Sequence, residues 1–297
     1  MSHPALASGH VAVVTGAAQG IGLAIVRALA ARGLTVAMID ANARQMSDAV
    51  ATLPGVSLLP VVVDVADEGA MMDAAQRIRR DLGPVHVLVN NAGVTTRGGP
   101  WGGVDAWRRN MGINLFGVLQ GQAAFLPDMI EAGLPGLVVN LGSKEGITTP
   151  PGNAAYSVAK AGVKVLTEQT AHELRQICGD RITAHLLVPG YTFTPMNFPG
   201  MSDETAKPPA PWTADQVAAA MIDAVESGRF YILCPDNEVT PELDAKRIAW
   251  AAGDMIEGRP ALSRWHPDFA AHFTESASAY NQKQSYCDPA QNREGRK

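Results

Sequence analysis

The chain has 297 residues, of which 46% are hydrophobic and 18% charged, and its formal net charge is −5 at pH 7. This length and apolar content suffice for a full core in one large domain, although length alone would also allow two. The acidic balance argues against a nucleic acid or an anionic membrane surface as partner, and no stretch reaches the roughly 18 apolar residues of a membrane span.

The first predicted elements are a buried strand and a helix joined by a glycine-rich turn. Residues 11–14 are all apolar, as in a strand buried on both faces, and an apolar helix continues from Leu23. The turn contains Gly16, Gln19, Gly20, Ile21 and Gly22. Glycines there let the backbone approach a pyrophosphate, whose charge is favoured by the free N–H groups and the helix dipole. The turn predicts a dinucleotide site, with simple packing as the alternative.

Asp40 ends the next predicted strand and lies 18 positions beyond Gly22. A carboxylate there can accept both ribose hydroxyls of NAD and would repel the extra phosphate of NADP. Gln19 and Ala41, the neighbours best placed to offer that phosphate a cation, are uncharged. We therefore expect NAD rather than NADP as cofactor. A solvated turn residue or a helix N-cap is the alternative interpretation of Asp40.

Strands and helical segments alternate up to about residue 235. The strands predicted after the first are 36–40, 57–63, 85–90, 137–141, 182–188 and 229–234. A helix at 214–226, with Thr213 as its N-cap, precedes the last of them. This alternation predicts an α/β fold, a doubly wound parallel sheet of about seven strands with helices on both faces. No linker interrupts residues 1–235, which are expected to form one domain.

Tyr156 and Lys160 lie four positions apart in a helix predicted over 154–174. This spacing places both on one face, where the ammonium can lie near the phenol. We expect Lys160 and the cationic ring of NAD+ to lower the pKa of Tyr156 from about 10 toward neutrality, which would make it a general base. Ser143 follows the strand 137–141 at the carboxyl edge of the sheet, where its hydroxyl can hydrogen-bond a substrate oxygen.

Together these residues resemble the short-chain dehydrogenase/reductase family over about residues 9–235. The shared motifs, in family order, are the glycine turn, Asp64-Val65, Asn90-Asn91-Ala92-Gly93, Asn114, Ser143, Tyr156-Ser157-Val158-Ala159-Lys160 and Pro189-Gly190. The resemblance implies a Rossmann fold with an Asn-Ser-Tyr-Lys active site. In it, Tyr156 exchanges the alcohol proton while hydride moves between the carbinol carbon and the nicotinamide. Asn114 would hold a water in a proton relay to Lys160.

The resemblance also implies the cofactor contacts. Asp64 and Val65 would flank the adenine, Asn91, Ala92 and Gly93 the adenosine-side ribose, and Tyr156 and Lys160 the nicotinamide side. Pro189, Gly190, Thr192 and Thr194 would border the nicotinamide. Thr192 stands where the family usually has an apolar β-branched residue, which puts that contact in doubt, whereas Thr194 matches the usual threonine.

The substrate pocket of such a fold is bordered by the residues after Ser143, those before Tyr156 and the segment after Gly190. The candidate substrate-binding residues are Lys144, Glu145, Asn153, Tyr191, Phe193, Met196 and Phe198. Aromatic residues and methionine in the segment 191–212 predict a bulky hydrophobic or aromatic secondary alcohol, with packing of a surface loop or a subunit contact as the alternative. Lys144 and Glu145 either recognise a polar substituent or pair with each other.

Beyond residue 235 the chain continues for more than sixty residues. We expect a helical extension of the same domain over 236–281, with a helix at 241–257, and a poorly ordered tail over 282–297. The extension either covers the substrate segment or a neighbouring subunit, or packs as a plain additional helix.

Three cysteines, Cys178, Cys234 and Cys287, are far apart in the sequence, which fits neither a disulfide framework nor a metal site. We expect reduced thiols and no metal. The start of the chain lacks the basic and apolar regions of a signal peptide, so a cytoplasmic location is expected. A helix beginning near Gly112 is apolar nearly all round through residue 130. With the resemblance, this predicts a homodimer or a homotetramer.

Three classes of function remain, each with a small molecule as partner. The first is an NAD-dependent dehydrogenase interconverting a secondary alcohol and a ketone. The second is a reductase that uses NADH to reduce a ketone or a ketoacyl compound. The third is a non-catalytic NAD-binding sensor or scaffold, which is disfavoured because Asn114, Ser143, Tyr156 and Lys160 are all intact.

Overall fold

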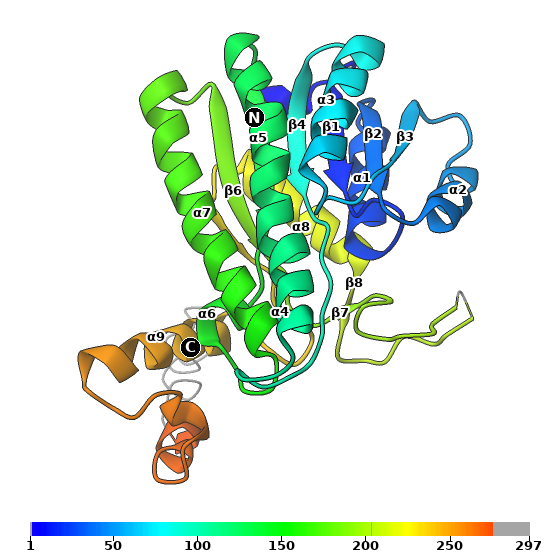
Figure 1. The fold of residues 1–297 in the computed structure, drawn as a ribbon. Coiled ribbons are helices and arrows are strands. Elements are labelled where there is room, and N and C mark those ends of the chain that lie inside the picture. Colours follow the sequence, from blue (N-terminus) through cyan, green and yellow to red (C-terminus); the bar gives the residue numbers. More distant parts are fainter. Residues whose placement is uncertain (1, 203, 276–297) are drawn as a thin grey trace, which may run out of the picture. The chain divides into compact units, whose positions relative to one another are not determined.

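Within residues 2–202 and 204–275, which the computed structural model describes, seven parallel strands form one sheet in the order β3-β2-β1-β4-β5-β6-β9 (Figure 1). The strands are β1 (Val11–Thr15), β2 (Thr35–Asp40), β3 (Leu58–Val62), β4 (Val85–Asn90), β5 (Gly136–Leu141), β6 (Ile182–Val188) and β9 (Tyr231–Leu233). The predicted doubly wound sheet is confirmed. Contacts divide the chain into two units, Met1–Glu238, which holds this sheet, and Val239–Lys297.

Helices cover both faces of the sheet, because successive strand residues point to opposite sides. Ala12 and Val14 of β1 belong to one core, with apolar residues of α1, α2 and α8, whereas Val13 belongs to the other, with α3, α5 and α7 (Figure 1). The helices are α1 (Gly20–Ala31), α2 (Ala43–Ala51), α3 (Glu68–Leu82), α4 (Val104–Met111), α5 (Gly117–Glu131), α6 (Glu145–Thr148), α7 (Ala154–Cys178) and α8 (Ala214–Glu226).

The start of α8 shows how local sequence sets an element. Thr213 accepts a hydrogen bond from the backbone N–H of Gln216, and the Gln216 side chain accepts one from the Thr213 N–H in return. This capping box satisfies two N–H groups that the first helical turn would leave unpaired. The predicted helix over 214–226 and its N-cap are confirmed.

The helical segment around Asn114 differs from its prediction. It begins at Val104 rather than near Gly112, and α4 and α5 are joined by a π-helical turn, η2 (Gly112–Phe116). The start was missed because α4 is rich in charged residues and lacks the apolar pattern on which the prediction relied. Such turns concentrate at functional sites, and this one contains Asn114.

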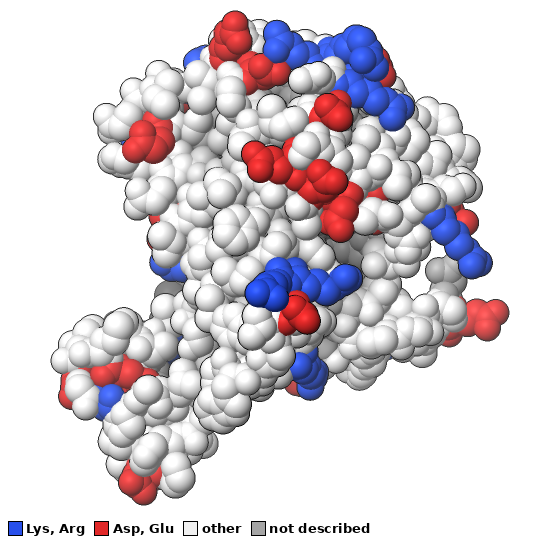
Figure 2. Space-filling view, in the orientation of Figure 1, with Lys and Arg blue, Asp and Glu red and all other residues white. Residues whose placement is uncertain are grey.

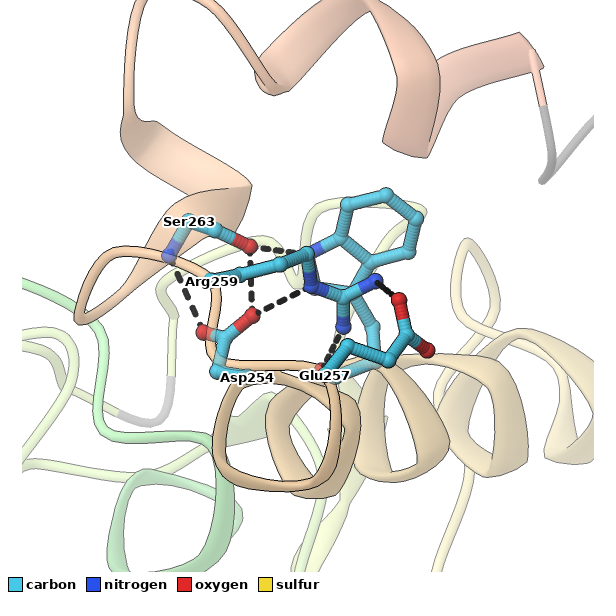
Figure 3. A network of polar contacts seen from close by, with 5 residues as sticks. Asp254, Glu257, Arg259 and Ser263 are labelled. Carbon is cyan, nitrogen blue, oxygen red and sulfur yellow. Dashed lines mark hydrogen bonds and ion pairs between the residues drawn. The ribbon is translucent and has the colours of Figure 1, made fainter.

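The unit that starts at Val239 contains the helix α9 (Pro241–Ile256) and the 3-10 turn η3 (Ser263–Trp265). Asp254 and Arg259 fasten the end of α9 to η3 (Figure 3). The Asp254 carboxylate accepts hydrogen bonds from Arg259 and from the backbone and hydroxyl of Ser263, and the guanidinium lies 4.1 Å from the Trp250 ring centroid. The tail predicted over 282–297 lies outside the described residues.

Among the described residues, every helix is too short or too polar to cross a bilayer.

Candidate active site

A cavity of about 910 Å³ lies at the carboxyl ends of the central strands. The strand order reverses between β1 and β4, because the chain continues from β1 to β2 and β3 on one side and from β4 to β5 and β6 on the other. Open α/β sheets bind their ligands at such a switch point. The cavity is bordered by residues from both halves of the sheet. Those that follow or end a strand include Gly16, Asp40, Val63, Asn91, Gly142 and Pro189.

The glycine turn forms one wall of this cavity, with Gly16, Gln19, Gly20 and Ile21 lining it. Gly16 has φ +61°, and a Cβ there would lie 2.8 Å from the Cα of Ala92. Gly22 is behind the turn, where a Cβ would lie 2.0 Å from the Gly16 carbonyl oxygen. Gln19 is the N-cap of α1 but its side chain makes no capping hydrogen bond. The backbone N–H groups of this helix start thus suit the pyrophosphate of a dinucleotide.

Asp40 lies in the same cavity at the end of β2. One of its carboxylate oxygens accepts from the N–H of Ala18 at 3.1 Å and the other from the N–H of Asn42 at 2.9 Å. These bonds hold the carboxylate beside the glycine turn. Arg44, in the first turn of α2, also lines the cavity, which places a cation close to the side where only uncharged neighbours were expected.

The residues predicted to border the adenine and its ribose line the cavity together. They are Asp64, Val65, Asn91, Ala92 and Gly93. The side-chain amide of Asn91 donates to the backbone carbonyls of Thr15 and Gly16, both at 2.9 Å, and the Thr15 hydroxyl accepts from the N–H of Ala92 at 3.0 Å. Asn91 therefore fixes the glycine turn against the end of β4.

Ser143, Tyr156 and Lys160 line the same cavity and lie close to one another. Ser143 follows β5, and the other two lie one turn apart in α7. The Lys160 Nζ is 5.8 Å from the centroid of the Tyr156 ring and donates to the Leu141 carbonyl at 2.7 Å. The structure brings together the three side chains that the sequence singled out for proton transfer.

Burial governs the pKa of Tyr156 in this structure. Burial raises the pKa of Tyr156 to about 12, an effect that a hydrogen bond from Ser143 opposes and the charge of Glu145 reinforces. Burial also lowers the pKa of Lys160 to about 8. The expectation that Lys160 and the cationic ring of NAD+ together bring the phenol toward neutrality stays a prediction, and the burial of the phenol acts against it.

Asn114 is fully buried in η2 and does not itself line the cavity. Its side chain exchanges two hydrogen bonds with the backbone of Val94, and its amide also donates to Asn110 at 2.6 Å. A Cβ on Gly93 would lie 2.9 Å from the Asn114 Oδ1 and 3.8 Å from the Lys160 Nζ, so the three residues are neighbours. The water relay to Lys160 stays a prediction.

The segment after β6 closes the cavity beside the glycine turn, with Pro189, Gly190, Thr192 and Thr194 among its lining. Thr192 is buried, and its hydroxyl donates to the Gly190 carbonyl at 2.9 Å. Thr194 is a neighbour of Gly20, where a Cβ would lie 3.4 Å from it. The hydroxyl group of Thr192, which an apolar residue would lack, is thus hydrogen-bonded within the loop.

Of the seven residues predicted to bind substrate, five line the cavity: Lys144, Glu145, Asn153, Tyr191 and Met196. Phe193 and Phe198, although both are described, are not among the lining residues. Their rings contact each other edge to face at 4.8 Å, and Phe198 also stacks on Tyr191 at 5.6 Å. Lys144 forms an ion pair with Asp236, whereas the Glu145 carboxylate accepts from Asn153.

Several lining residues were missed by the sequence argument. They include Arg44, Val94, Thr95, Arg109, Ile113 and Asn197. Thr95 lies in the loop that follows β4, and the carboxyl end of a central strand is itself a signal for ligand contact. Arg44 and Arg109 lie on helices, where no residue pattern marks them as facing the cavity.

Comparison with known proteins agrees with this geometry. Residues 10–205 match the family model described as short chain dehydrogenase. A 2-(R)-hydroxypropyl-CoM dehydrogenase of Xanthobacter autotrophicus is 35% identical over 63% of this chain and 76% of its own length. A galactitol 2-dehydrogenase (L-tagatose-forming) of Cereibacter sphaeroides is 36% identical over 63% of this chain and 73% of its own.

Among solved structures, a short-chain dehydrogenase/reductase of Burkholderia phymatum in complex with NAD has a TM-score of 0.77. It is 27% identical to this chain, and the alignment covers 87% of this chain and 97% of that one. The matched model spans more than half of the chain and includes the glycine turn, Ser143, Tyr156 and Lys160. The chain therefore belongs to the short-chain dehydrogenase family.

Proposed function

We propose that the protein is an NAD-dependent dehydrogenase that interconverts a secondary alcohol and a ketone, with residues 1–235 as its catalytic domain. Family membership makes it an oxidoreductase of alcohols or ketones that uses NAD or NADP. The observation that carries the finer proposal is the presence of Ser143, Tyr156 and Lys160 in one cavity with the glycine turn and Asp40.

The proposed chemistry assigns a separate task to each side chain. In the oxidation direction Tyr156 accepts the alcohol proton, and the Ser143 hydroxyl hydrogen-bonds the substrate oxygen. Lys160 supplies a buried positive charge that stabilises the phenolate form of Tyr156 relative to a site without it. NAD, when bound, would supply the hydride acceptor. Reduction of a ketone reverses both transfers.

The choice of NAD rests on Asp40. A carboxylate held by two backbone N–H groups is well placed to accept ribose hydroxyls and repels a phosphate at the same position. Bound NAD in the Burkholderia phymatum relative supports this choice. Arg44 acts in the opposite sense, since its cation would attract the phosphate of NADP, and we give Asp40 the larger weight because it is fixed in place.

The substrate proposal follows from the apolar residues of the cavity lining. Tyr191 and Met196 add apolar surface to the lining, and a volume of about 910 Å³ leaves room for a ring or a chain beside a dinucleotide. We therefore infer a bulky secondary alcohol. The two curated relatives named above act, by their names, on different alcohols, so they support the class of reaction and no single substrate.

A homodimer or a homotetramer is also proposed. Phe116, Leu119, Val158 and Val165 of η2, α5 and α7 are large apolar residues that are between 44 and 54% exposed. Figure 2 shows a surface with few charges over α5 and α7, as expected of a face that another subunit covers. We name these four residues the α5–α7 face.

The test is the appearance of NADH at 340 nm with NAD+ or NADP+ and secondary alcohols graded from small aliphatic to bulky aryl compounds. Oxidation with NAD+ is expected, and Tyr156→Phe should reduce kcat by roughly 10²–10⁴-fold with NAD binding nearly unchanged. Tyr231→Phe, at an exposed tyrosine of β9, is the matched control. Binding of NAD without turnover of any alcohol or ketone would favour the sensor hypothesis, and full activity of Tyr156→Phe would refute the assignment of the base.

A further inference from the structure

Glu145 places a carboxylate next to the proposed reacting groups. It is the first residue of α6 and lies two positions after Ser143, whose hydroxyl oxygen accepts a hydrogen bond from the Glu145 N–H at 3.1 Å. Both residues line the cavity. Burial raises the pKa of Glu145, and its charge in turn helps to raise the pKa of Tyr156. The carboxylate is therefore part of the environment of the reacting atoms.

Asn153 holds this carboxylate in position. Its side-chain amide donates to Glu145 Oε2 at 3.0 Å and to the Thr95 hydroxyl at 3.1 Å. The backbone around Asn153 is itself paired with the loop after β4, because the Ala154 N–H donates to the Gly98 carbonyl at 3.1 Å. Glu145 is thus oriented by contacts from two other loops rather than left to move in solvent.

One buried hydrogen-bond acceptor at this place lacks a donor. Asn153 Oδ1 is buried without a partner among the described residues, and the same side chain orients the Glu145 carboxylate through its amide. Both residues line the cavity. A buried acceptor without a donor is unfavourable, and it is the arrangement expected where a ligand supplies the missing hydrogen.

We propose that Glu145, together with Asn153, accepts a hydrogen bond from a second hydroxyl group of the substrate, so that the preferred substrate is a vicinal diol or a polyol. The inference rests on the proposed function, because the first hydroxyl is the one that Ser143 and Tyr156 engage. We assign the second hydroxyl to the carbon next to the carbinol, because the Glu145 N–H contacts Ser143, both residues line the cavity and the charge of Glu145 acts on Tyr156.

The charges around Glu145 favour a neutral hydroxyl over an ammonium group. The Arg97 cation acts on Glu145 and lowers its pKa, in opposition to burial. Arg109 also lines the cavity. An ammonium group in the ligand would be repelled by these guanidinium groups, whereas a hydroxyl supplies the donor without adding charge.

The experiment compares cyclohexane-1,2-diol with cyclohexanol and 2-methoxycyclohexanol. NADH formation gives kcat/KM, and calorimetric titration in the presence of NADH gives affinity without oxidation. The variants are Glu145→Gln, which keeps the size of the side chain, and Glu145→Ala, which removes both acceptors. Glu173→Gln, at an exposed acid of α7, is the matched control.

We expect the wild-type protein and Glu173→Gln to prefer the diol over both other compounds by roughly 10- to 100-fold, as for a hydrogen bond to a charged acceptor. The ratio of kcat/KM for the diol to kcat/KM for cyclohexanol should shrink in Glu145→Gln and fall to about one in Glu145→Ala, whatever the change in the rate on cyclohexanol itself.

A diol preference that survives Glu145→Ala overturns the inference, and so does a diol that binds no tighter than cyclohexanol or fails to bind. Preferential, Glu145-dependent binding without NADH formation supports the inference while it defeats the proposed dehydrogenase activity. Oxidation of cyclohexane-1,2-diol and cyclohexanol with equal kcat/KM supports the proposed dehydrogenase activity and overturns the inference about Glu145.

Discussion

The ammonium of Lys160 donates a 2.7 Å hydrogen bond to the backbone carbonyl of Leu141, the last residue of β5. This bond joins the middle of α7 to the strand whose continuation carries Ser143. Tyr156, one helical turn before Lys160, is thereby held at the same edge of the sheet as Ser143. The burial of the ammonium opposes folding, which is why its pKa falls to about 8.

Replacement of Lys160 by Met should separate activity from stability. Met keeps an unbranched side chain of similar volume and removes the buried charge. Replacement of a buried charge by an apolar group often leaves the free energy of unfolding unchanged or raises it. We therefore expect kcat/KM to fall by roughly 10²-fold or more, as for loss of a group that supports acid–base catalysis. The urea midpoint of unfolding should stay equal or rise.

Lys164→Met is the matched control, because Lys164 lies one turn further along α7, where it is partly exposed and pairs with Glu168. Its kcat/KM should remain within about 2-fold of the wild type, since exposed ion pairs contribute little. Wild-type kcat/KM in Lys160→Met would contradict the role given to the buried ammonium.

Cofactor choice should depend on two residues of opposite charge. Asp40→Ala should raise KM for NAD+ by roughly 10-fold or more, since hydrogen bonds to a charged acceptor are lost, and should relax discrimination against NADP+. Arg44→Ala should sharpen the preference for NAD+, because the cation that attracts the extra phosphate is gone. KM values for both cofactors, measured on one alcohol, give the answer.

Asp48→Ala is the control for Asp40→Ala, because it removes one negative charge as well. Asp48 lies in α2 and is not among the residues that line the cavity. An unchanged ratio of kcat/KM values for NAD+ and NADP+ in Asp40→Ala would show that another residue recognises the ribose.

The sequence predicts the scaffold well because the scaffold follows from local patterns. The apolar run of β1, the capping box of Thr213 and the spacing of Tyr156 and Lys160 each have a direct structural counterpart. The family motifs then place these elements around one cavity. The sheet and the meeting of Ser143 with Tyr156 could therefore be predicted without coordinates.

The remainder depends on contacts between segments far apart in the chain. The π-helical turn at Asn114 accompanies its bonds to Val94, twenty positions away, and no local pattern encodes them. The raised pKa of Tyr156 follows from burial, which spacing alone does not give. Asn153 and Glu145 were each recognised as candidates, but their joint orientation required the structure.

Acid should destabilise the protein through three histidines at the amino end of the sheet, of which His86 and His185 are buried and His3 is half-buried. Burial lowers the pKa of His3, His86 and His185 below the ordinary value of 6.5, and the neighbouring His185 and His10 lower those of His3 and His86 further. The Arg229 carbonyl acts in the opposite sense on His185, and Glu226 on His3. Thr183 joins two of them, with its hydroxyl 3.1 Å from His3 and 2.9 Å from His185.

The sign of the effect follows from these lowered values. Above pH 6.5 the rings are neutral in both states, so their stabilisation is fully present there. As the pH falls below 6.5 the unfolded chain binds protons first, and stability declines until the folded-state pKa values are passed. The urea midpoint should therefore fall between pH 7.5 and pH 5.5. His185→Gln should flatten this decline, and His172→Gln, at an exposed position, should leave it as steep as in the wild type.

Self-association should depend on the α5–α7 face. Val165 on α7 is 54% exposed. The substitution Val165→Asp introduces a carboxylate there, and burial of a carboxylate in an apolar subunit contact is strongly unfavourable. Light scattering at micromolar concentration should therefore give a dimer or a tetramer for the wild type and a smaller species for the variant. Met72→Asp, at an exposed apolar residue of α3, should assemble as the wild type does. A monomeric wild type would refute the predicted oligomer. An unchanged mass of the Val165→Asp protein would show that the subunit contact lies on another face.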